Sequence, residues 1–500
     1  MEIQQQVIAE IAKEVVSRLR AQMQSPQASA APASAMNIVG ARAGSSGLGT
    51  PQGMRQGTGD GVFATVDEAV NAAYEAQKKV GEMSLADRGR LIDVIRRICN
   101  DRREELGKME LDETRVGRLD HKILKLTNMR FVLGVEAMQS GARSDKSGLC
   151  IIERAPWGVI GMMLPVTHSV PTMASNAINI IAAGNTAVFG PHPSGKRVAQ
   201  YALQLFNREF ERELGVTNVL TTVLEPSLEA ADAIFNHPRV ALLAVTGGPA
   251  VVRAASKSGK RVIAAGPGNP PVVVDETADL NHAARCIIEG AAFDNNLLCI
   301  GEKEVFVVAS VADAFIAAMR RAGAYELDKA GIERLTKAAF TFEGGGGGCA
   351  RAHVKKDLVG KDVAVLAAAA SVRVPGDTQL LFGETEENHP FVVEEQMMPF
   401  VPVVRVKDVD AAIAAAVKAE HGYRHTAVIH TQNVNTATRM ARAMNTTLLI
   451  HNAASPASLG VGGPGYFSHS IATPTGEGVT TPLTFTRERQ MVVGHALRIV

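Results

Sequence analysis

Three features that would narrow a function quickly are missing from this sequence: a charge imbalance, a long apolar run and paired cysteines. Its 500 residues carry 52 Lys and Arg against 51 Asp and Glu, which gives no electrostatic reason to bind nucleic acid or an anionic membrane. No apolar stretch approaches the roughly 20 residues needed to cross a bilayer, and the N-terminus lacks the apolar block of a signal peptide. We expect a soluble, cytoplasmic protein that binds neither nucleic acid nor a membrane.

The five cysteines are scattered. None forms a CxxC pair, and no histidine lies at metal-ligand spacing from one of them, so the sequence predicts neither a disulfide framework nor a metal site. A reducing compartment fits this pattern. The cysteines are Cys99, Cys150, Cys286, Cys299 and Cys349.

Hydrophobic residues make up 46% of the chain, enough to bury sizeable cores. A chain this long exceeds what one hydrophobic core supports, so we expect two or three domains.

The N-terminal segment is predicted to be a separate amphipathic helix over residues 1–22. Apolar residues recur every fourth position from Ile3 to Leu19, and charged residues occupy the other side. Residues 23–60 are rich in Ala, Ser, Gly, Pro and Gln and are predicted to be a flexible linker. A tethered helix of this kind favours docking to a partner. Packing on its own body or on a neighbouring subunit is the alternative, and a membrane-surface role is less favoured because its charges are balanced.

From about residue 61 the sequence predicts alternating strands and helices, and hence parallel sheets with helices on their faces. Strands are expected in 157–166, 185–190, 216–223 and 240–248. One helix is expected in 170–184, and another begins with a cap at Ser194 and ends at Gly215. Residues 271–293, 303–310 and 311–323 repeat the pattern, which indicates a second α/β domain. The run Gly344–Gly348 favours a mobile loop, with a phosphate cradle as the alternative.

Cys299 lies in a short polar turn between a helix with an apolar face and the strand expected at 303–310. Asp294, Asn295 and Asn296 should break the helix, because Asn tolerates left-handed backbone geometry. A cysteine at such a turn can face a cleft while nearby backbone N–H groups remain free for an oxyanion. Most cysteines, however, are small core residues, so the local pattern alone leaves both interpretations open.

Five motifs in register resemble the aldehyde dehydrogenase superfamily over about residues 60–500. They are WGVIGMMLPVTHSVPTMASNAINIIAAGNTAVFGPHPS, VTGGPAVV, AAGPGNPPVVVD, FDNNLLCIGEKEV and EEQMMPFVPVV. Within the superfamily the chain resembles the CoA-acylating enzymes of bacterial microcompartments. The resemblance implies a Rossmann-type nucleotide-binding domain, an α/β catalytic domain and a small β extension for oligomerisation. It also implies that the N-terminal helix is an encapsulation peptide that binds shell proteins.

The resemblance assigns Cys299 as the nucleophile that forms a thioester with the substrate carbon. The Cys299 N–H and the side chain of Thr167 would stabilise the oxyanion. Hydrolytic members carry Asn at the position of Thr167, so this chain departs from their pattern. His168 beside it can be a substrate contact, although a single histidine is more often structural.

Hydrolytic members also carry a glutamate that activates water. Ala264 stands in its place here. A CoA thiol needs that base less, because its pKa is near that of cysteine, about 8.5. The absent carboxylate therefore favours thiolysis over hydrolysis, with a disabled hydrolase as the alternative.

The resemblance implies that NAD and coenzyme A bind in the same pocket, one after the other. Its expected contacts in the order of the chain are Pro165, Gly190, Pro191, His192, Pro193, Thr246, Gly247, Gly248, Glu395 and Met397. Glu395 matches the residue that holds the nicotinamide ribose. Gly190 stands where many hydrolytic members have a lysine for the adenosine ribose. The turn Thr246-Gly247-Gly248 precedes a helix expected to open at Pro249, a geometry that presents free N–H groups to a phosphate.

The predicted domains are nucleotide-binding (61–142 and 156–264), catalytic (265–482) and oligomerisation strands (143–155 and 483–500), the last forming a homodimer or tetramer. The predicted reaction oxidises a short-chain aldehyde with NAD and transfers the acyl group to CoA. Propanal is the expected substrate, and the reaction is expected to take place inside a microcompartment. A hydrolytic aldehyde dehydrogenase and a non-catalytic shell-docking protein are the alternatives. The preferred aldehyde, the choice of NAD or NADP, the direction and any contact of Gly344–Gly348 with CoA stay open.

Overall fold

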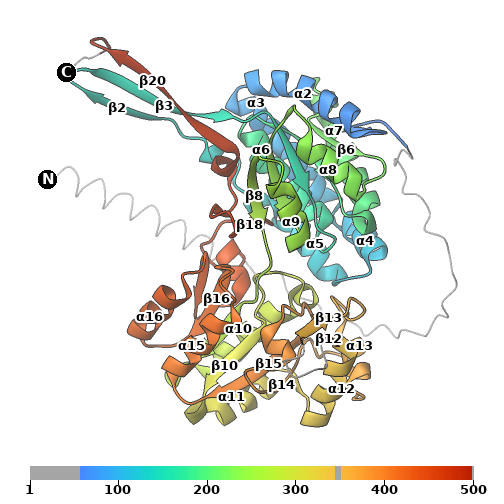
Figure 1. Cartoon of the computed structure of the whole chain (residues 1–500), viewed down its shortest axis with the longest axis vertical. Coiled ribbons are helices and arrows are strands. Elements are labelled where there is room, and N and C mark those ends of the chain that lie inside the picture. The colour runs from blue at the N-terminus through green and yellow to red at the C-terminus, as the bar shows by residue number, and fades with distance from the viewer. Residues whose placement is uncertain (1–56, 344–350, 498–500) are drawn as a thin grey trace, which may run out of the picture. The chain divides into compact units, whose positions relative to one another are not determined.

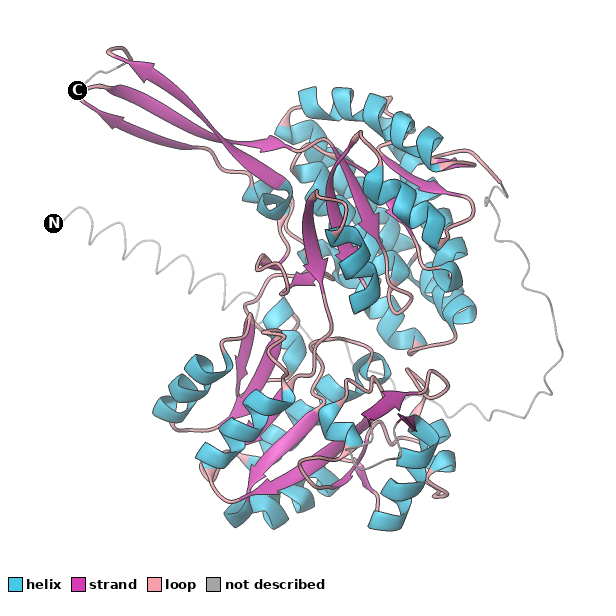
Figure 2. Cartoon of the chain, viewed as in Figure 1, coloured by secondary structure: helices cyan, strands magenta, loops and turns pink. Residues whose placement is uncertain are grey.

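A computed structural model describes residues 57–343 and 351–497. The predicted helix at 1–22, most of the predicted linker and the run Gly344–Gly348 lie outside these residues. The described chain belongs to one compact unit, Gly53–Val500. Its α/β architecture is that predicted for an aldehyde dehydrogenase-like fold (Figure 1, Figure 2).

The first sheet has six parallel strands in the order β1-β6-β5-β4-β7-β8. Apolar side chains are buried on both of its faces, as expected for a parallel sheet with helices on each side. The strands are β1 (Val62–Phe63), β4 (Val159–Met163), β5 (Thr186–Gly190), β6 (Leu220–Val223), β7 (Val240–Thr246) and β8 (Arg261–Ala265). The helices are α2 (Val66–Glu82), α3 (Leu85–Asp101), α4 (Arg103–Thr114), α5 (Leu119–Thr127), α6 (Ser169–Ala182), α7 (Lys196–Leu214), α8 (Leu228–Asn236) and α9 (Pro249–Ser256).

The start of α7 differs from the prediction. Ser194 is not its cap; the N-cap is Gly195, which has no side chain to offer, and Ser194 lies in a short 3-10 turn. The carboxylate of Glu113, on α4, accepts the N–H groups of Arg197 and Val198 at 2.9 and 2.8 Å. A cap supplied from a distant helix leaves no local sequence pattern, which is why the prediction was wrong here.

The second sheet has seven parallel strands in the order β11-β14-β15-β10-β9-β16-β17. They are β9 (Pro271–Val274), β10 (Glu304–Val308), β11 (Tyr325–Glu326), β14 (Leu381–Glu384), β15 (Phe400–Val406), β16 (Thr426–His430) and β17 (Leu448–His451). The helices are α10 (Leu280–Ala292), α11 (Ala309–Arg321), α12 (Lys329–Ala339), α13 (Val363–Ala369), α14 (Pro390–Val393), α15 (Val409–Ala419) and α16 (Val434–Met444). A hairpin of β12 (Phe340–Glu343) and β13 (Arg351–Val354) flanks the undescribed glycine run.

After β17 the chain returns to the first sheet. Leu459, Phe467 and Phe485 are buried in the same apolar cluster as the helices that cover that sheet. A two-stranded sheet in this segment pairs β18 (Ile471–Ala472) with β19 (Gly478–Val479). The domain boundaries stay a prediction. Leu459 and Phe467, assigned by sequence to the catalytic domain, and Phe485, assigned to the oligomerisation strands, pack in the core around the first sheet.

A three-stranded antiparallel sheet extends away from the helices (Figure 1). It consists of β2 (Gly141–Asp145), β3 (Gly148–Pro156) and β20 (Thr486–Gly494). Two apolar side chains on β20, Met491 and Val492, are 56% and 72% exposed. The sheet therefore presents apolar surface that the described part of this chain leaves uncovered.

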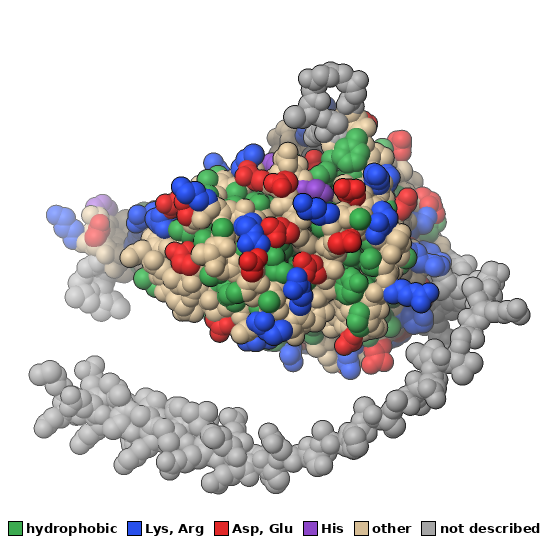
Figure 3. All heavy atoms as spheres, turned by 90° about the horizontal axis from the view of Figure 1, so that it is seen from below, with side chains coloured by type: hydrophobic (Ala, Val, Ile, Leu, Met, Phe, Trp, Pro, Cys, Tyr) green, Lys and Arg blue, Asp and Glu red, His purple; other side chains and the backbone are tan. Residues whose placement is uncertain are grey.

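The surface carries both signs of charge. On the face shown in Figure 3, basic and acidic side chains of the described residues alternate with apolar ones, without a large patch of one sign. No helix within the described ranges is long and apolar enough to span a membrane.

Candidate active site

The turn before Cys299 has the backbone geometry that its sequence predicts. Helix α10 ends at Ala292, and a 3-10 turn follows at Phe293–Asn296. The φ angles of Asp294, Asn295 and Asn296 are 51°, 56° and 64°, all in the left-handed region. The predicted helix break is thus confirmed. The chain changes direction at this turn and passes through Cys299 into β10.

A buried ion pair holds this turn in place. Lys125 on α5 binds the carboxylate of Asp294, and both side chains are buried. Asp294 also accepts the backbone N–H of Arg118 at 2.7 Å. Burial alone would raise the pKa of Asp294, but the positive charges of Lys125 and Lys122 outweigh it and lower the pKa. A charged carboxylate therefore ties the left-handed turn to α5.

A second buried cation lies inside the loop that carries Cys299. The ammonium of Lys303 donates to the carbonyl oxygens of Asn296 and Leu298, each at 3.0 Å, and to the Asn296 side chain. Lys303 is completely buried. It closes the loop from within and places a positive charge near the thiol.

Burial raises the pKa of the Cys299 thiol to about 12, and the negative charge of Glu395 adds to this effect. Lys303 and the backbone N–H groups of Cys299 and Ile300 act in the opposite direction. The thiol is therefore protonated in the free protein at neutral pH. The same N–H groups that favour a thiolate are donors available to an oxyanion beside it.

Cys299 lines a cavity of about 530 Å³ at the carboxyl ends of the parallel strands in the first sheet. This is where ligands bind in open α/β sheets. Every residue predicted for the site lines this cavity. They are Pro165, Thr167, Gly190, Pro191, His192, Pro193, Thr246, Gly247, Gly248, Cys299, Glu395 and Met397. The structure brings them together; their individual roles stay predictions.

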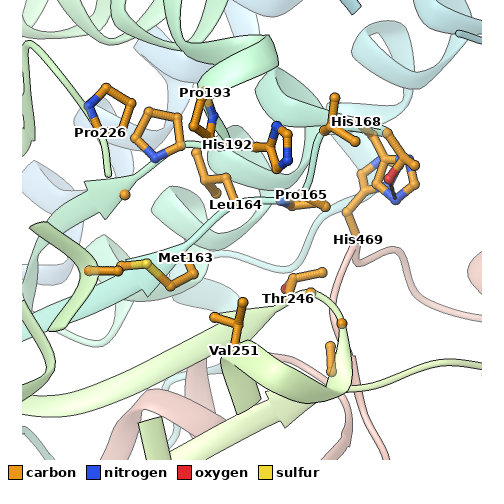
Figure 4. A pocket seen from close by; sticks show the side chains of 18 of the residues that line it. Met163, Leu164, Pro165, His168, His192, Pro193, Pro226, Thr246, Val251 and His469 are labelled. Atoms are coloured by element: carbon orange, nitrogen blue, oxygen red, sulfur yellow. Dashed lines mark hydrogen bonds between the residues drawn. The ribbon is translucent and has the colours of Figure 1, made fainter. Parts of the chain in front are cut away.

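Thr167 and His168 lie at one end of the cavity. In Figure 4 the side chain of His168 is next to that of His469, and their ring centroids are 5.5 Å apart. The hydroxyl oxygen of Thr167 is 3.2 Å from Nε2 of His168. Burial and the nearby Lys125 lower the pKa of His168 well below its usual range, and burial lowers that of His469 to about 3. Both rings are therefore neutral.

Another part of the cavity wall, around Gly247 and Gly248, suits a phosphate-containing ligand. Helix α9 begins at Pro249, as predicted, and its N-cap Gly248 has no side-chain cap. A Cβ atom on Gly247 or Gly248 would meet no other atom within 4 Å, so open space lies beside this backbone. None of the described residues that line the cavity is Lys or Arg. A diphosphate would therefore be held by N–H groups and the helix dipole, and the residues fit such a cofactor.

Glu395 is the one carboxylate among the described residues that line the cavity. Burial raises its pKa to about 7, while Lys303 and the Gly268 N–H pull the pKa down. The pKa of Glu395 therefore lies well above the usual range of a carboxyl group. The next cavity residue, Met397, has a φ of 48°.

Ala264 lies inside β8 and is completely buried, and its N–H donates to Thr475 at 3.0 Å. The residues that follow it, Ala265, Gly266 and Pro267, line the cavity instead. None of these carries a proton-accepting side chain. The loop from β8 approaches the backbone of Cys299 closely, since a Cβ on Gly268 would be 2.6 Å from the carbonyl oxygen of Cys299.

The sequence did not reveal several cavity residues. His469 comes from the segment that returns after β17, and Met163, Pro226, Leu228 and Val251 complete the wall around the predicted residues. Most of these residues lie close to the end of a predicted strand, and this position was the only sequence signal that they line a cavity. His469 has no such signal, because its place depends on the return of the chain.

The parallel sheets, the cavity at their strand ends and Cys299 in its wall fit the predicted family, and the sequence profile of the aldehyde dehydrogenase family matches residues 59–328. The chain belongs to this family, which confirms the resemblance. It is 45% identical over 442 residues to the acetaldehyde dehydrogenase (acetylating) EutE of Salmonella typhimurium (strain LT2), covering 88% of this chain and 94% of the relative.

Two solved structures are similar to this chain along most of its length. One is a propionaldehyde dehydrogenase from the fucose utilisation bacterial microcompartment of Clostridium phytofermentans, with 40% identity and a TM-score of 0.85, covering 88% of this chain and 100% of that one. The other is a propionaldehyde dehydrogenase of Rhodopseudomonas palustris with bound CoA and an acylated cysteine. It has 40% identity and a TM-score of 0.85, and covers 89% of this chain and 100% of that one.

Proposed function

We propose that this protein is a CoA-acylating aldehyde dehydrogenase, which converts a short-chain aldehyde, CoA and NAD to an acyl-CoA and NADH. One observation carries the proposal: Cys299 lines the cavity, whereas the position of the water-activating glutamate is the buried Ala264. Such a site can form a thioester but has no residue at that position to hydrolyse it.

The chain's own groups account for the first covalent step. The Cys299 thiol loses its proton to solvent water. The sulfur forms a bond to the aldehyde carbon, and the electron pair of the C=O bond moves to oxygen. The Cys299 N–H and the Thr167 hydroxyl stabilise this oxyanion.

The backbone at Thr246, Gly247 and Gly248 would hold the diphosphate of NAD, and Glu395 its nicotinamide ribose. When bound, NAD accepts the hydride that leaves the substrate carbon, and the thioester remains on Cys299. The CoA thiolate then attacks the thioester carbon, the bond to Cys299 breaks, and the acyl group leaves on CoA. Because a thiol of pKa about 8.5 ionises readily near neutral pH, this step needs a base less than hydrolysis does.

The substrate is a short aliphatic aldehyde, and propanal is the substrate we expect. The relatives that carry this assignment are named for acetaldehyde and propionaldehyde. One methylene group changes selectivity by only about 1–3 kcal/mol, so neighbouring chain lengths should also react.

The protein is proposed to act inside a bacterial microcompartment, as a homodimer or a tetramer. Exposed Met491 and Val492 on the antiparallel sheet support self-association, because apolar strand surface is normally covered. The amphipathic pattern of residues 1–22 supports docking to shell proteins. Deleting residues 1–22 should leave activity intact and release the enzyme from purified compartments, and retention of the truncated enzyme would contradict docking.

Product analysis tests the proposed reaction. The purified protein is incubated with propanal, NAD and CoA, and the products are separated by chromatography. Propanoyl-CoA should appear in proportion to NADH, and Cys299→Ser should form neither while still binding NAD. Free propanoate in place of propanoyl-CoA would contradict the proposal and favour the hydrolytic alternative. Comparing acetaldehyde, propanal and butanal under the same conditions identifies the preferred chain length.

A further inference from the structure

The hydroxyl of Thr167 has one hydrogen and two possible recipients for it. Its oxygen is 3.2 Å from Nε2 of His168, so the two side chains share a hydrogen bond. If Nε2 lacks a hydrogen, the hydroxyl donates to the ring and has nothing left for an oxyanion. If Nε2 carries the hydrogen, the ring donates to the hydroxyl oxygen, and the hydroxyl hydrogen is free. The tautomer of His168 therefore decides whether Thr167 can act.

The surroundings of His168 keep the ring neutral, so that it carries a single N–H. The ring is buried, with 6% of its residue surface exposed. Lys122 and Lys125 on α5 and the neutral His469 face it, and the two cations oppose a further positive charge. Glu110 and Asp294 are paired with these lysines rather than with the ring.

The two ring nitrogens differ in their partners. Nδ1 of His168 is buried and has no hydrogen-bond partner among the described residues, whereas Nε2 has the Thr167 hydroxyl. Placing the hydrogen on Nδ1 would bury an N–H group without an acceptor, an arrangement that proteins rarely tolerate. Placing the hydrogen on Nε2 gives that N–H group the Thr167 oxygen as its acceptor. Only the lone pair of Nδ1 is then left without a partner among the described residues.

The backbone around the pair is fixed from two further sides. The ammonium of Lys122 is 3.5 Å from the carbonyl oxygen of Thr167. The hydroxyl of Ser169 donates to the carbonyl oxygen of Pro165 at 3.0 Å. The contact between Thr167 and His168 thus belongs to a braced loop rather than to a free surface pair.

We propose that His168 is a positioning residue: its Nε2–H donates to the Thr167 oxygen and thereby directs the single hydroxyl hydrogen toward the substrate oxyanion. This inference rests on the proposed function, in which that oxyanion forms when the Cys299 sulfur bonds to the aldehyde carbon. Donation to the hydroxyl oxygen also polarises its O–H bond, which strengthens the second hydrogen bond. The pair replaces the amide N–H that an Asn at position 167 would supply.

The tautomer itself can be observed without substrate or cofactor. In protein labelled with nitrogen-15 at histidine, the ring signals that disappear in His168→Gln belong to His168. Their chemical shifts should report hydrogen on Nε2 and none on Nδ1. Hydrogen on Nδ1 would overturn the inference even if the protein makes acyl-CoA, so this result is separate from the fate of the proposed function.

Kinetics test the consequence. His168→Phe keeps a ring of similar size without a donor and should slow the single-turnover formation of NADH roughly 10- to 100-fold, somewhat less than the loss of a whole oxyanion donor. The KM for propanal should change little. His168→Gln, whose amide can donate, should recover most of the rate.

A double-mutant cycle separates this role from a general effect on structure. In a Thr167→Val background, His168→Phe should cause no further loss of rate, because the hydroxyl it positions is gone. The inference would be overturned if the loss of rate in the double variant were the product of the losses in the two single variants. It would also be overturned if His168→Phe were as fast as the wild type. Thermal unfolding of each variant provides the control for folding.

Discussion

The Nζ of Lys303 lies 3.0 Å from the carbonyl oxygen of Leu298, the residue directly before Cys299. Lys303 therefore has two effects on the site: it closes the loop by hydrogen bonds, and it opposes the rise of the thiol pKa caused by burial and Glu395. Replacing Lys303 removes this buried positive charge from the surroundings of Cys299.

Lys303→Met should raise the pKa of Cys299 further and slow its alkylation by iodoacetamide at pH 9. The loop carbonyls at Asn296 and Leu298 also lose their donor, so thermal stability should fall. Mass spectrometry of the Cys299 peptide measures the alkylation rate, and the half-buried Cys150 in the same digest is the control. Unchanged alkylation of Cys299 would show that Lys303 has no electrostatic effect on the thiol.

Gly268→Ala should impair the enzyme by displacing the backbone of Cys299. The new Cβ would lie 2.6 Å from the Cys299 carbonyl oxygen and 2.9 Å from the His425 ring, so the loop must move. Displacing a reacting atom by about 1 Å lowers rates on the order of 100-fold. The matched control is Gly376→Ala, where no atom lies within 4 Å. Equal kcat values for the two variants would refute the close approach.

Asp294→Asn should destabilise the protein by roughly 3–5 kcal/mol, because it leaves buried Lys125 without its counter-charge. Urea unfolding measures the change. The double variant Lys125→Met with Asp294→Asn should recover part of the loss, since no unpaired buried charge remains. If the single variant is as stable as the wild type, the ion pair does not stabilise the left-handed turn.

Glu302 should make stability depend on pH between about 4.5 and 7. Its buried carboxyl accepts the N–H and hydroxyl of Ser455 at 2.9 and 2.8 Å, and burial raises its pKa to about 7. The folded state thus binds a proton that the unfolded state releases above about pH 4.3. This contribution is complete below that pH and is lost as pH rises through 7.

Glu302→Gln retains an acceptor for the Ser455 N–H and removes the titration. Between pH 5 and 8 the wild type should therefore lose roughly 3 kcal/mol more of its unfolding free energy than the variant does. Urea unfolding at several pH values measures both curves. Glu289→Gln, which removes an exposed carboxyl on α10, should behave like the wild type. Parallel curves for wild type and Glu302→Gln would disprove the buried titration.

The sequence predicted what depends on local pattern. Strand and helix alternation follows from apolar periodicity, the break at Asp294–Asn296 follows from residues that tolerate left-handed geometry, and α9 begins at Pro249 where a proline suits a first turn. The family resemblance then supplied catalytic and cofactor-binding residues from distant segments, and all of these line one cavity.

Features that depend on packing were not predictable. Lys122 and Lys125 on α5 would ordinarily face solvent, yet both are buried against Glu110 and Asp294. The cap on α7 comes from Glu113, far away in the chain. His469 reaches the cavity only because the chain returns to the first sheet. In each case the partner is set by tertiary structure, which local periodicity does not encode.

A turnover experiment without CoA tests the central claim, that the acyl group leaves Cys299 on a thiol and not on water. With propanal and NAD alone, NADH formation should stop after about one equivalent per active site. The Cys299 peptide should then carry the mass of a propanoyl group, and adding CoA should restart the reaction and yield propanoyl-CoA. Continuous NADH formation without CoA, accompanied by free propanoate, would contradict the account.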